Sequence, residues 1–312
     1  MNKIILDVDT GIDDAIGILL ACASPEVDIQ GITTVSGNID LESATRNTLR
    51  VLKLIGRDKE IQVYKGATKP LVRPTRYATE IHGASGLAGQ LEDIEVSHDN
   101  PVHAVDFMIE TLRGNPGQIT VIMTGPETNF ALAIAKEPRV VDWVKEVIIM
   151  GGAADMLGNE SPVAEFNIAI DPEAAERVFQ CGAKVTMVGL DVTTKALLTQ
   201  DDAKRVKDPK VRDFVAGATY DYMMRFNAKK GIEACSMHDP LAVCMAIDPK
   251  FVKTLHRFVG VETQSVYCDG MTVCDFDNRW GKEPNVHVAM EVEARNFIDF
   301  LVDRLSSLTA AL

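Results

Sequence analysis

The stretch KIILDVDTGIDDAIGILLACA, residues Lys3–Ala23, decides the fold of the amino-terminal part of this chain. It opens with an apolar run at residues 4–6 and breaks at Thr10-Gly11. Apolar residues then return at helical spacing: Ile12, Ala15, Ile16, Leu19, Leu20 and Ala23. An apolar run, a break and an amphipathic period predict a buried strand, a tight turn and a helix.

Four aspartates crowd the junction between this strand and this helix: Asp7, Asp9, Asp13 and Asp14. An Asp in the first turn of a helix is favoured by capping and by the helix dipole, but this accounts for Asp13 or Asp14 singly and not for all four. Such concentrated negative charge needs a cation to neutralise it. Because carboxylates are hard oxygen ligands, calcium or magnesium is favoured over zinc or iron, which usually recruit histidine or cysteine.

The composition is that of an ordinary globular protein, with 46% hydrophobic and 25% charged residues. The net charge of -13 argues against nucleic acid or an anionic membrane surface as partner, because both repel an acidic protein. Asp7 and Asp9 interrupt the amino-terminal apolar run, unlike a signal peptide, and no stretch has the ~18 apolar residues of a membrane helix. We therefore expect a cytoplasmic protein.

Its six cysteines lack CxxC spacing, which is typical of reduced thiols.

Strand and helix patterns alternate along the chain. Strands are expected over residues 28–35, 61–64, 118–123, 144–150 and 184–190, and helices over 40–56, 101–114, 127–136 and 171–180. Residues 66–99 lack a period and predict a long loop, which in compact domains is usually a lid or a binding element. Past Thr194 the pattern is mostly helical to about residue 248, and a β-hairpin is expected around residues 267–276. An amphipathic helix over residues 293–305 ends the chain.

This alternation implies right-handed crossovers and a mainly parallel sheet. No linker, internal repeat or low-complexity segment divides the 312 residues. We therefore expect a single α/β domain over residues 1–312, with a Rossmann-like central sheet flanked by helices, a small β-hairpin and a C-terminal helix.

Polar residues follow several of the expected strands. Asp7 and Asp9 follow the first strand, Asn38 the second, Thr124 the strand before Gly125-Pro126, and Met150 ends the next one. In open parallel sheets ligands bind beyond the carboxyl ends of the strands, so these residues predict one shared pocket.

Motifs in this pattern resemble those of one enzyme family. Residues 7–15, DVDTGIDDA, resemble the DxDxGxDDA signature of the nucleoside hydrolases, which often has proline at the position of Thr10. Further segments match the family pattern in order: Thr124–Asn129, Met150–Gly152, Glu165–Asn167, Gly189–Thr193 and Met237–Pro240. Glu127 stands where the family usually has leucine. The resemblance implies cleavage of the N-glycosidic bond of ribonucleosides by a homodimer or homotetramer.

The resemblance also implies a metal site and a general base. Asp9, Asp14, Asp239 and the main-chain carbonyl of Thr124 are expected to bind calcium, which tolerates crowded, irregular coordination better than magnesium does. Asp9 is expected to take a proton from a water molecule held by the cation. For Asp239 alone, the alternative is a helix cap ahead of Pro240. Because Asp13 and Asp14 point about 100° apart on a helix, Asp14 is assigned to the cation and Asp13 to the sugar.

The resemblance places further residues at the nucleoside. Residues that resemble the hydroxyl-binding set of the family are Asp13, Asn38, Asn159, Glu165 and Asn167. Asp14, Met150 and Phe166 belong to the same matched segments and are included in the expected substrate site. An extended conformation at residues 165–167 would direct Glu165 and Asn167 to one side. The alternative for residues 165–167 is a surface strand whose polar side chains point outward.

The nucleobase needs a proton donor when it leaves. His238, next to Asp239, resembles the family histidine with that task, and the alternative is a histidine hydrogen-bonded in the core. His82 lies in the long loop and is a candidate contact, although a lone loop histidine is more commonly a surface residue. Phe226 lies in an aromatic-rich segment and is a candidate for stacking on the base, with a core position as the alternative.

Two other functions remain open on these residues. Asp7-Val8-Asp9 after a first strand resembles the nucleophile and acid of haloacid-dehalogenase-type phosphatases, but Gly11 occupies a position where that family has threonine or valine. A calcium-dependent protein that binds ribosides without turnover is the second alternative. It would need neither the base nor the acid.

Overall fold

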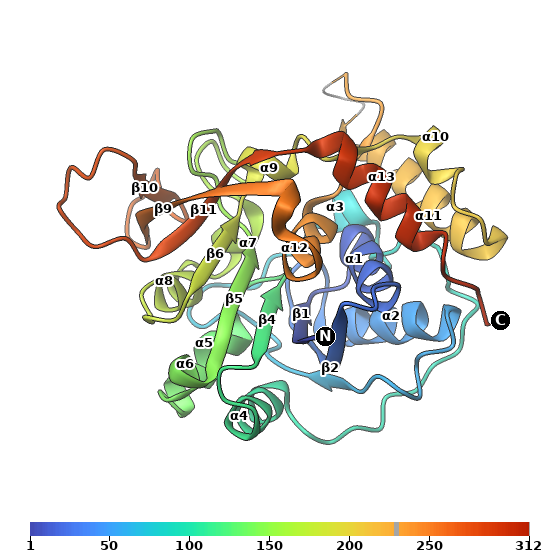
Figure 1. Ribbon diagram of the computed structural model, residues 1–312, viewed down its shortest axis with the longest axis horizontal. Helices are drawn as coiled ribbons and strands as arrows, with labels where there is room; N and C mark the ends of the chain where they lie inside the picture. The colour runs from blue at the N-terminus through green and yellow to red at the C-terminus, as the bar shows by residue number, and fades with distance from the viewer. Residues whose placement is uncertain (228–230, 312) are drawn as a thin grey trace.

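A computed structural model describes residues 1–227 and 231–311 (Figure 1). A nine-stranded sheet crosses this part of the molecule, with helices on both faces. In spatial order its strands are β10 (Thr272–Asp275), β9 (Val252–Val261), β11 (Val286–Val292), β6 (Val185–Val188), β5 (Val144–Met150), β4 (Ile119–Met123), β1 (Asn2–Val8), β2 (Val27–Thr34) and β3 (Val63–Lys65). Two short strands, β7 (Leu197–Leu198) and β8 (Cys235–Ser236), pair separately.

Helices connect most of these strands. They are α1 (Ile12–Cys22), α2 (Leu41–Leu54), α3 (Thr79–His82), α4 (Ala104–Gly114), α5 (Thr128–Lys136), α6 (Val140–Trp143), α7 (Phe166–Ile170), α8 (Pro172–Phe179), α9 (Leu190–Thr193), α10 (Gln200–Ala203), α11 (Pro209–Tyr222), α12 (His238–Ile247) and α13 (Ala294–Leu305). A π-helix, η1 (Met223–Asn227), follows α11, and a 3₁₀ turn, η3 (Pro249–Phe251), follows α12.

The sheet is mainly parallel. Every neighbouring pair from β3 to β11 is parallel, and only β9 and β10 add antiparallel pairs at one edge. This arrangement confirms the predicted single-domain α/β fold with a flanked central sheet. The final helix is also confirmed, because α13 covers nearly the predicted range.

Strand β1 separates two cores. Ile4 and Leu6 pack into the core beside α1 and α12, whereas Ile5 packs into the core beside α4 and α5. Both faces are covered, so the strand contains consecutive apolar residues instead of the alternation of a half-exposed strand. The first unit of the chain therefore forms as predicted, with β1 leading through Gly11 into α1.

The predicted start of the helix after residue 100 is wrong. Helix α4 begins at Ala104, where the main-chain N–H of Val105 donates to the side chain of His103. The Asn100 side-chain amide instead donates to the carbonyl of Val63 in β3 at 3.1 Å. Asn100 is thus held at the sheet and does not cap the helix.

The predicted β-hairpin is also misplaced. The antiparallel partner of β10 is β9, and residues 262–271 connect the two strands. The segment predicted as a whole hairpin, residues 267–276, therefore contains one strand and part of the connection. Strand β9 pairs with both β10 and β11, and these long-range pairings are not visible as a local sequence pattern.

Two expectations from composition can be compared with the described residues. All six cysteines are free, as predicted. In residues 1–227 and 231–311, none of the helices combines the length and the apolar character that a bilayer crossing requires.

Candidate active site

A cleft lies beyond the carboxyl ends of β1, β2, β4 and β5, where open parallel sheets bind ligands. It contains about 420 Å³ of empty space, including its open mouth. Its lining includes predicted site residues from eight segments of the chain: Asp13, Asn38, His82, Thr124, Met150, Asn159, Glu165, Phe166, Asn167, His238 and Asp239. Asp9 and Asp14 are buried and contact this lining.

The turn before α1 brings its aspartates to the cleft. The Gly11 main-chain N–H donates to Asp14 Oδ2 at 2.9 Å, and Thr124 Oγ1 donates to Asp14 Oδ1 at 2.7 Å. Gly11 is required here because a Cβ atom would lie 2.5 Å from Nδ1 of His82. The close approach of His82 to this turn therefore depends on glycine.

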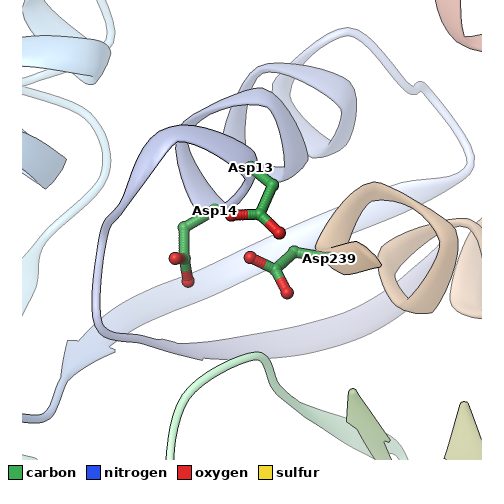
Figure 2. Close-up of side chains that lie close together, drawn as sticks. All are labelled: Asp13, Asp14 and Asp239. Carbon is green, nitrogen blue, oxygen red and sulfur yellow. The ribbon is translucent and has the colours of Figure 1, made fainter. Parts of the chain in front are cut away.

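Three carboxylates converge at one point of the cleft. One oxygen of each of Asp13, Asp14 and Asp239 lies within 4.8 Å of the others. Figure 2 shows Asp13 and Asp14 at the start of α1, facing Asp239 at the start of α12. Although Asp13 and Asp14 are adjacent on a helix, both contribute to this group. Among the described residues, the group thus includes Asp13, which was not a predicted metal ligand, and lacks Asp9, which was.

This carboxylate group fits a cation. Asp13 Oδ1 has no hydrogen-bond partner among the described residues. Burial and then the charge of Asp14 raise the pKa of Asp13 to about 8, and burial and the charges of Asp13 and Asp14 raise the pKa of Asp239. A bound cation would offset this desolvation and repulsion. Hard oxygen donors suit calcium or magnesium, so the acidic group could hold such an ion.

Asp9 lies beside this group and is held by the loop after β2. Its Oδ2 accepts the main-chain N–H of Asn38 at 2.6 Å, and its Oδ1 accepts the Asn38 side-chain amide at 3.0 Å. Burial and then the charge of Asp14 raise the pKa of Asp9. Gly37 is required for this packing, because a Cβ atom there would lie 2.1 Å from Asp9 Oδ2. The hydrogen bonds from Asn38 and the close approach of Gly37 therefore set the orientation of the Asp9 carboxylate.

The segment around α7 has a different conformation from the predicted one. Glu165 is the N-cap of α7 and accepts the main-chain N–H of Asn167 at 3.0 Å, so residues 165–167 are not extended. The Asn167 side-chain amide donates to the Thr124 carbonyl at 2.8 Å and to the Met150 carbonyl at 3.0 Å. A helix start, with its free N–H groups, thus holds Glu165 in place.

Asn159 and Phe166 lie together at the edge of the cleft. The Phe166 main-chain N–H donates to Asn159 Oδ1 at 2.9 Å. Burial raises the pKa of Glu165 to about 7, although three main-chain N–H groups donate to it and oppose the shift.

The cleft also contains two histidines and a tyrosine. His238 Nδ1 lies 2.7 Å from Thr193 Oγ1, and its Nε2 lies 3.4 Å from the Tyr222 hydroxyl. His82 Nδ1 accepts the main-chain N–H of Ile12 at 3.1 Å, and burial followed by the charge of His238 lowers the pKa of His82 to about 3. His82 is therefore buried at the cleft and neutral, and the surface alternative for it is wrong.

Tyr222, Ala78 and Ile81 line the cleft but were not predicted. Tyr222 lies in the aromatic-rich segment, yet its helical period alone favoured a core position, and nothing local distinguished it from its neighbours. Phe226 follows in η1, and its side chain lies outside the described part of the chain. Its stacking role stays a prediction.

Asp7 has a structural environment that differs from that of the other aspartates. Thr33 Oγ1 and the Asn129 side-chain amide both donate to Asp7 Oδ1, at 2.6 and 2.8 Å. The Asn129 contact places the Asp7 side chain next to α5, whereas Asp13 and Asp14 belong to α1. Asp7 does not line the cleft, which argues against its role as a phosphatase nucleophile.

Glu127, at the position where the family usually has leucine, is fully buried. Neither of its carboxyl oxygens has a hydrogen-bond partner among the described residues. Burial, followed by the charges of Glu165, Asp171 and Asp7, raises the pKa of Glu127 well above its ordinary value of 4.5. The side chain is thus a buried, uncompensated polar group, which destabilises the fold.

We expect Glu127→Leu to raise the free energy of unfolding by roughly 1–3 kcal/mol at neutral pH. Above pH 4.5 the unfolded chain ionises Glu127 while the folded chain keeps it protonated, so its cost grows with pH until the folded pKa is reached. Urea unfolding at pH 5 and pH 8, at one calcium concentration, should show the difference between the variant and the parent widening at pH 8. The control is Glu127→Gln, which should remove the pH dependence but retain a buried polar group. A leucine variant that is less stable at both pH values would contradict this.

Comparison with known proteins places the chain in a family. The family model described as inosine-uridine preferring nucleoside hydrolase matches residues 4–299. The pyrimidine-specific ribonucleoside hydrolase RihA of Escherichia coli O1:K1 is 42% identical over 307 residues, covering 97% of this chain and 97% of that protein. RihA of Citrobacter koseri is 41% identical over 308 residues, with the same coverage of both chains.

Solved structures agree with the sequence relatives. The plant nucleoside hydrolase PpNRh1 superimposes with a TM-score of 0.93 at 33% identity, covering 98% of this chain and 99% of that one. The purine-preferring ribonucleoside hydrolase from Gardnerella vaginalis gives a TM-score of 0.89 at 34% identity, covering 97% and 98%. The resemblance predicted from the motifs is confirmed. The chain belongs to the inosine-uridine preferring nucleoside hydrolase family.

Proposed function

We propose that this ribonucleoside hydrolase cleaves pyrimidine ribonucleosides to ribose and free base, with calcium as its cation. The observation that carries the proposal is the buried carboxylate group in a cleft that His238 also lines. A reaction that needs a base for water at the sugar and an acid at the departing nucleobase matches this combination of groups.

We assign the sugar to the carboxylate end. A ribose removed from water leaves several hydroxyl groups that need partners, and Asp13, Asn38, Asn159, Glu165 and Asn167 can donate to or accept from them. Calcium is assigned to Asp9, Asp14, Asp239 and the Thr124 carbonyl, with Asp13 close enough to contact either the ion or the sugar. When bound, calcium would supply positive charge that acidifies a nearby water and lowers the raised pKa values of these aspartates.

Asp9 is proposed as the general base. Two hydrogen bonds from Asn38 hold its carboxylate, which leaves further lone pairs for a proton. Water would form a bond to the anomeric carbon as the bond from that carbon to the nucleobase nitrogen breaks. Asp9 would take the proton of that water. Direct attack of this kind passes through an oxocarbenium-like state and inverts the configuration.

His238 is proposed as the general acid. A proton from its ring would go to the nucleobase nitrogen, so that the base leaves neutral. Thr193 and Tyr222 contact its two ring nitrogens and can orient the ring. A protein that only binds ribosides has no need for this pairing of base and acid.

The choice of pyrimidines is supported by the RihA relatives, which are named pyrimidine-specific and share 41–42% identity over nearly the whole chain. The purine-preferring structural relative shares 34%. We also propose a cytoplasmic homodimer or homotetramer, on the basis of the family resemblance and the composition.

The test is turnover by the purified protein over a panel of uridine, cytidine, inosine, adenosine and 2′-deoxyuridine. We expect ribose and free pyrimidine as products, with uridine and cytidine preferred. Loss of the 2′-hydroxyl should cost roughly 1–3 kcal/mol for each polar group left without a partner. Elemental analysis should find calcium, and chelation should remove activity that calcium restores. Release of phosphate, equal rates on 2′-deoxyuridine, or full turnover without calcium would each contradict a part of the proposal.

A further inference from the structure

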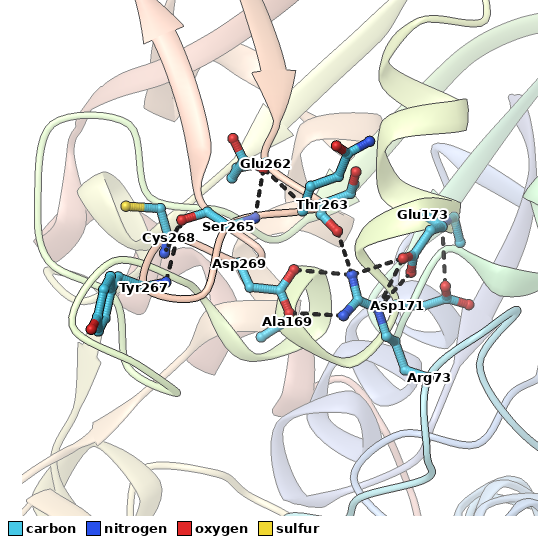
Figure 3. A network of polar contacts seen from close by, with 12 residues as sticks. Arg73, Ala169, Asp171, Glu173, Glu262, Thr263, Ser265, Tyr267, Cys268 and Asp269 are labelled. Atoms are coloured by element: carbon cyan, nitrogen blue, oxygen red, sulfur yellow. Dashed lines mark hydrogen bonds and ion pairs between the residues drawn. The ribbon is translucent and has the colours of Figure 1, made fainter.

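Arg73 lies in the long loop between β3 and α4 and binds two other segments of the chain (Figure 3). Its Nε donates to both carboxyl oxygens of Glu173, at 2.9 and 3.0 Å. Its Nη1 and Nη2 donate to the two oxygens of Asp269 at 3.1 and 3.0 Å, and Nη2 also donates to the Thr263 carbonyl at 2.7 Å. One guanidinium thus connects positions that are 100 and 196 residues away in sequence.

The Glu173 contact fixes the loop on the first turn of α8. The same turn holds the loop a second time, because the Leu71 main-chain N–H donates to Asp171 Oδ2 at 2.9 Å. Asp171 is the N-cap of α8 and directly follows α7, which contains Asn167 of the cleft. The loop is therefore attached next to the segment that carries the proposed ribose contacts.

The Asp269 and Thr263 contacts fix the connection between β9 and β10. This connection packs on the other side of the same segment. A Cβ atom on Gly270, whose φ is +76°, would lie 2.9 Å from the Cα atom of Ala169, and Met271 forms a β-bridge with Ala164. Arg73 therefore holds the connection against Ala164 and Ala169, which lie on either side of Glu165 and Asn167 in the sequence.

The loop itself continues from Arg73 to the cleft. Arg76 donates to the Ala169 carbonyl at 3.1 Å and pairs with Glu160 at 3.2 Å. The Ala78 main-chain N–H donates to the Asn38 carbonyl at 2.9 Å, and Ala78 and His82 then line the cleft. The same chain segment that Arg73 anchors thus forms the wall of the cleft near the two histidines.

We propose that Arg73 is a positioning residue of the substrate site, which holds the loop of residues 71–82 and the segment of residues 159–169 in one relative arrangement. The inference rests on the proposed function, because those two segments are taken to contact the substrate. Arginine suits the role because its planar fork binds Asp269 through two parallel bonds while Nε binds Glu173. Its side chain is 28% exposed, so solvent screens these contacts only in part.

The experiment compares Arg73→Met and Arg73→Lys with the parent in steady-state hydrolysis of uridine. We expect Arg73→Met to lower kcat/KM by roughly 10–100-fold, mainly through a higher KM, because misplaced contact segments weaken substrate binding. Arg73→Lys keeps the charge but loses the fork, so it should preserve the melting temperature without restoring KM. The matched control is Arg279→Met, since Arg279 also binds a carboxylate, that of Asp277, but is 80% exposed in the β10–β11 loop. The control should keep the parent KM.

Hydrogen exchange provides a readout that does not depend on activity. Exchange in residues 74–82 and 159–165 should be faster in Arg73→Met than in the parent and unchanged in Arg279→Met. If the parent hydrolyses no ribonucleoside, the proposed function fails, and the exchange data still test the anchoring by Arg73. The inference is overturned if Arg73→Met lowers the melting temperature with an unchanged KM, if Arg73→Lys restores KM fully, or if exchange in both segments stays at the parent rate.

Discussion

Asp9→Asn is expected to lower kcat by roughly 10²–10⁴-fold while nucleoside binding largely survives. The amide matches the carboxylate in shape and keeps one oxygen that can accept the Asn38 main-chain N–H, which lies 2.6 Å away in the parent. It cannot take a proton from water at neutral pH, so the chemical step is lost. Single-turnover rates with uridine measure that step, and calorimetry measures nucleoside affinity and calcium content.

The matched variant is Asp13→Asn. Asp13 directly precedes Asp14 and belongs to the same carboxylate group. We expect weaker nucleoside binding, because Asp13 is assigned to a sugar hydroxyl, while Asp14 and Asp239 still hold calcium. The assignment of roles is wrong if Asp9→Asn turns over normally while Asp13→Asn binds well but fails to react. In that case Asp13, whose Oδ1 has no hydrogen-bond partner among the described residues, would be the base.

His238→Ala is expected to slow uridine hydrolysis by roughly 10²–10⁴-fold and to slow a p-nitrophenyl riboside far less. Uracil leaves readily only when it is protonated, whereas p-nitrophenolate leaves without help. The loss should therefore appear on the natural substrate and be largely absent on the activated one. The measurement is kcat for both substrates in the variant and the parent.

Tyr222→Phe is the control for this prediction, because it removes the hydroxyl 3.4 Å from His238 Nε2 and retains the aromatic ring. It should keep most of the activity if Tyr222 only orients His238. Equal losses on uridine and on the p-nitrophenyl riboside in His238→Ala would show that the histidine supports the fold or the sugar site. The acid would then have to be sought among the other residues of the cleft.

Local sequence patterns predicted most of the fold. The apolar run and helical period of residues 3–23 led to β1 and α1, and Asp40 caps α2 as its position suggests, accepting the Ser43 main-chain N–H at 3.0 Å. These elements depend on contacts between residues a few positions apart, which a period or a cap signal reports directly. The failures at Asn100 and at the β-hairpin arose where a distant strand, β3 or β9, supplied the partner.

The sequence by itself determined the alternating α/β order, because residue type and spacing carry that information, and its family resemblance pointed to the residues proposed to bind a cation and a ribose. Only the tertiary structure decided which of them meet. Packing of α12 against α1 brings Asp239 to Asp13 and Asp14, more than 220 residues away, and the burial of the long loop brings His82 to the turn at Gly11. The contacts of Tyr222 and Thr193 with His238, and the anchoring of the loop by Arg73, arise in the same way. Such pairs depend on how whole helices and loops pack, and no local period encodes that.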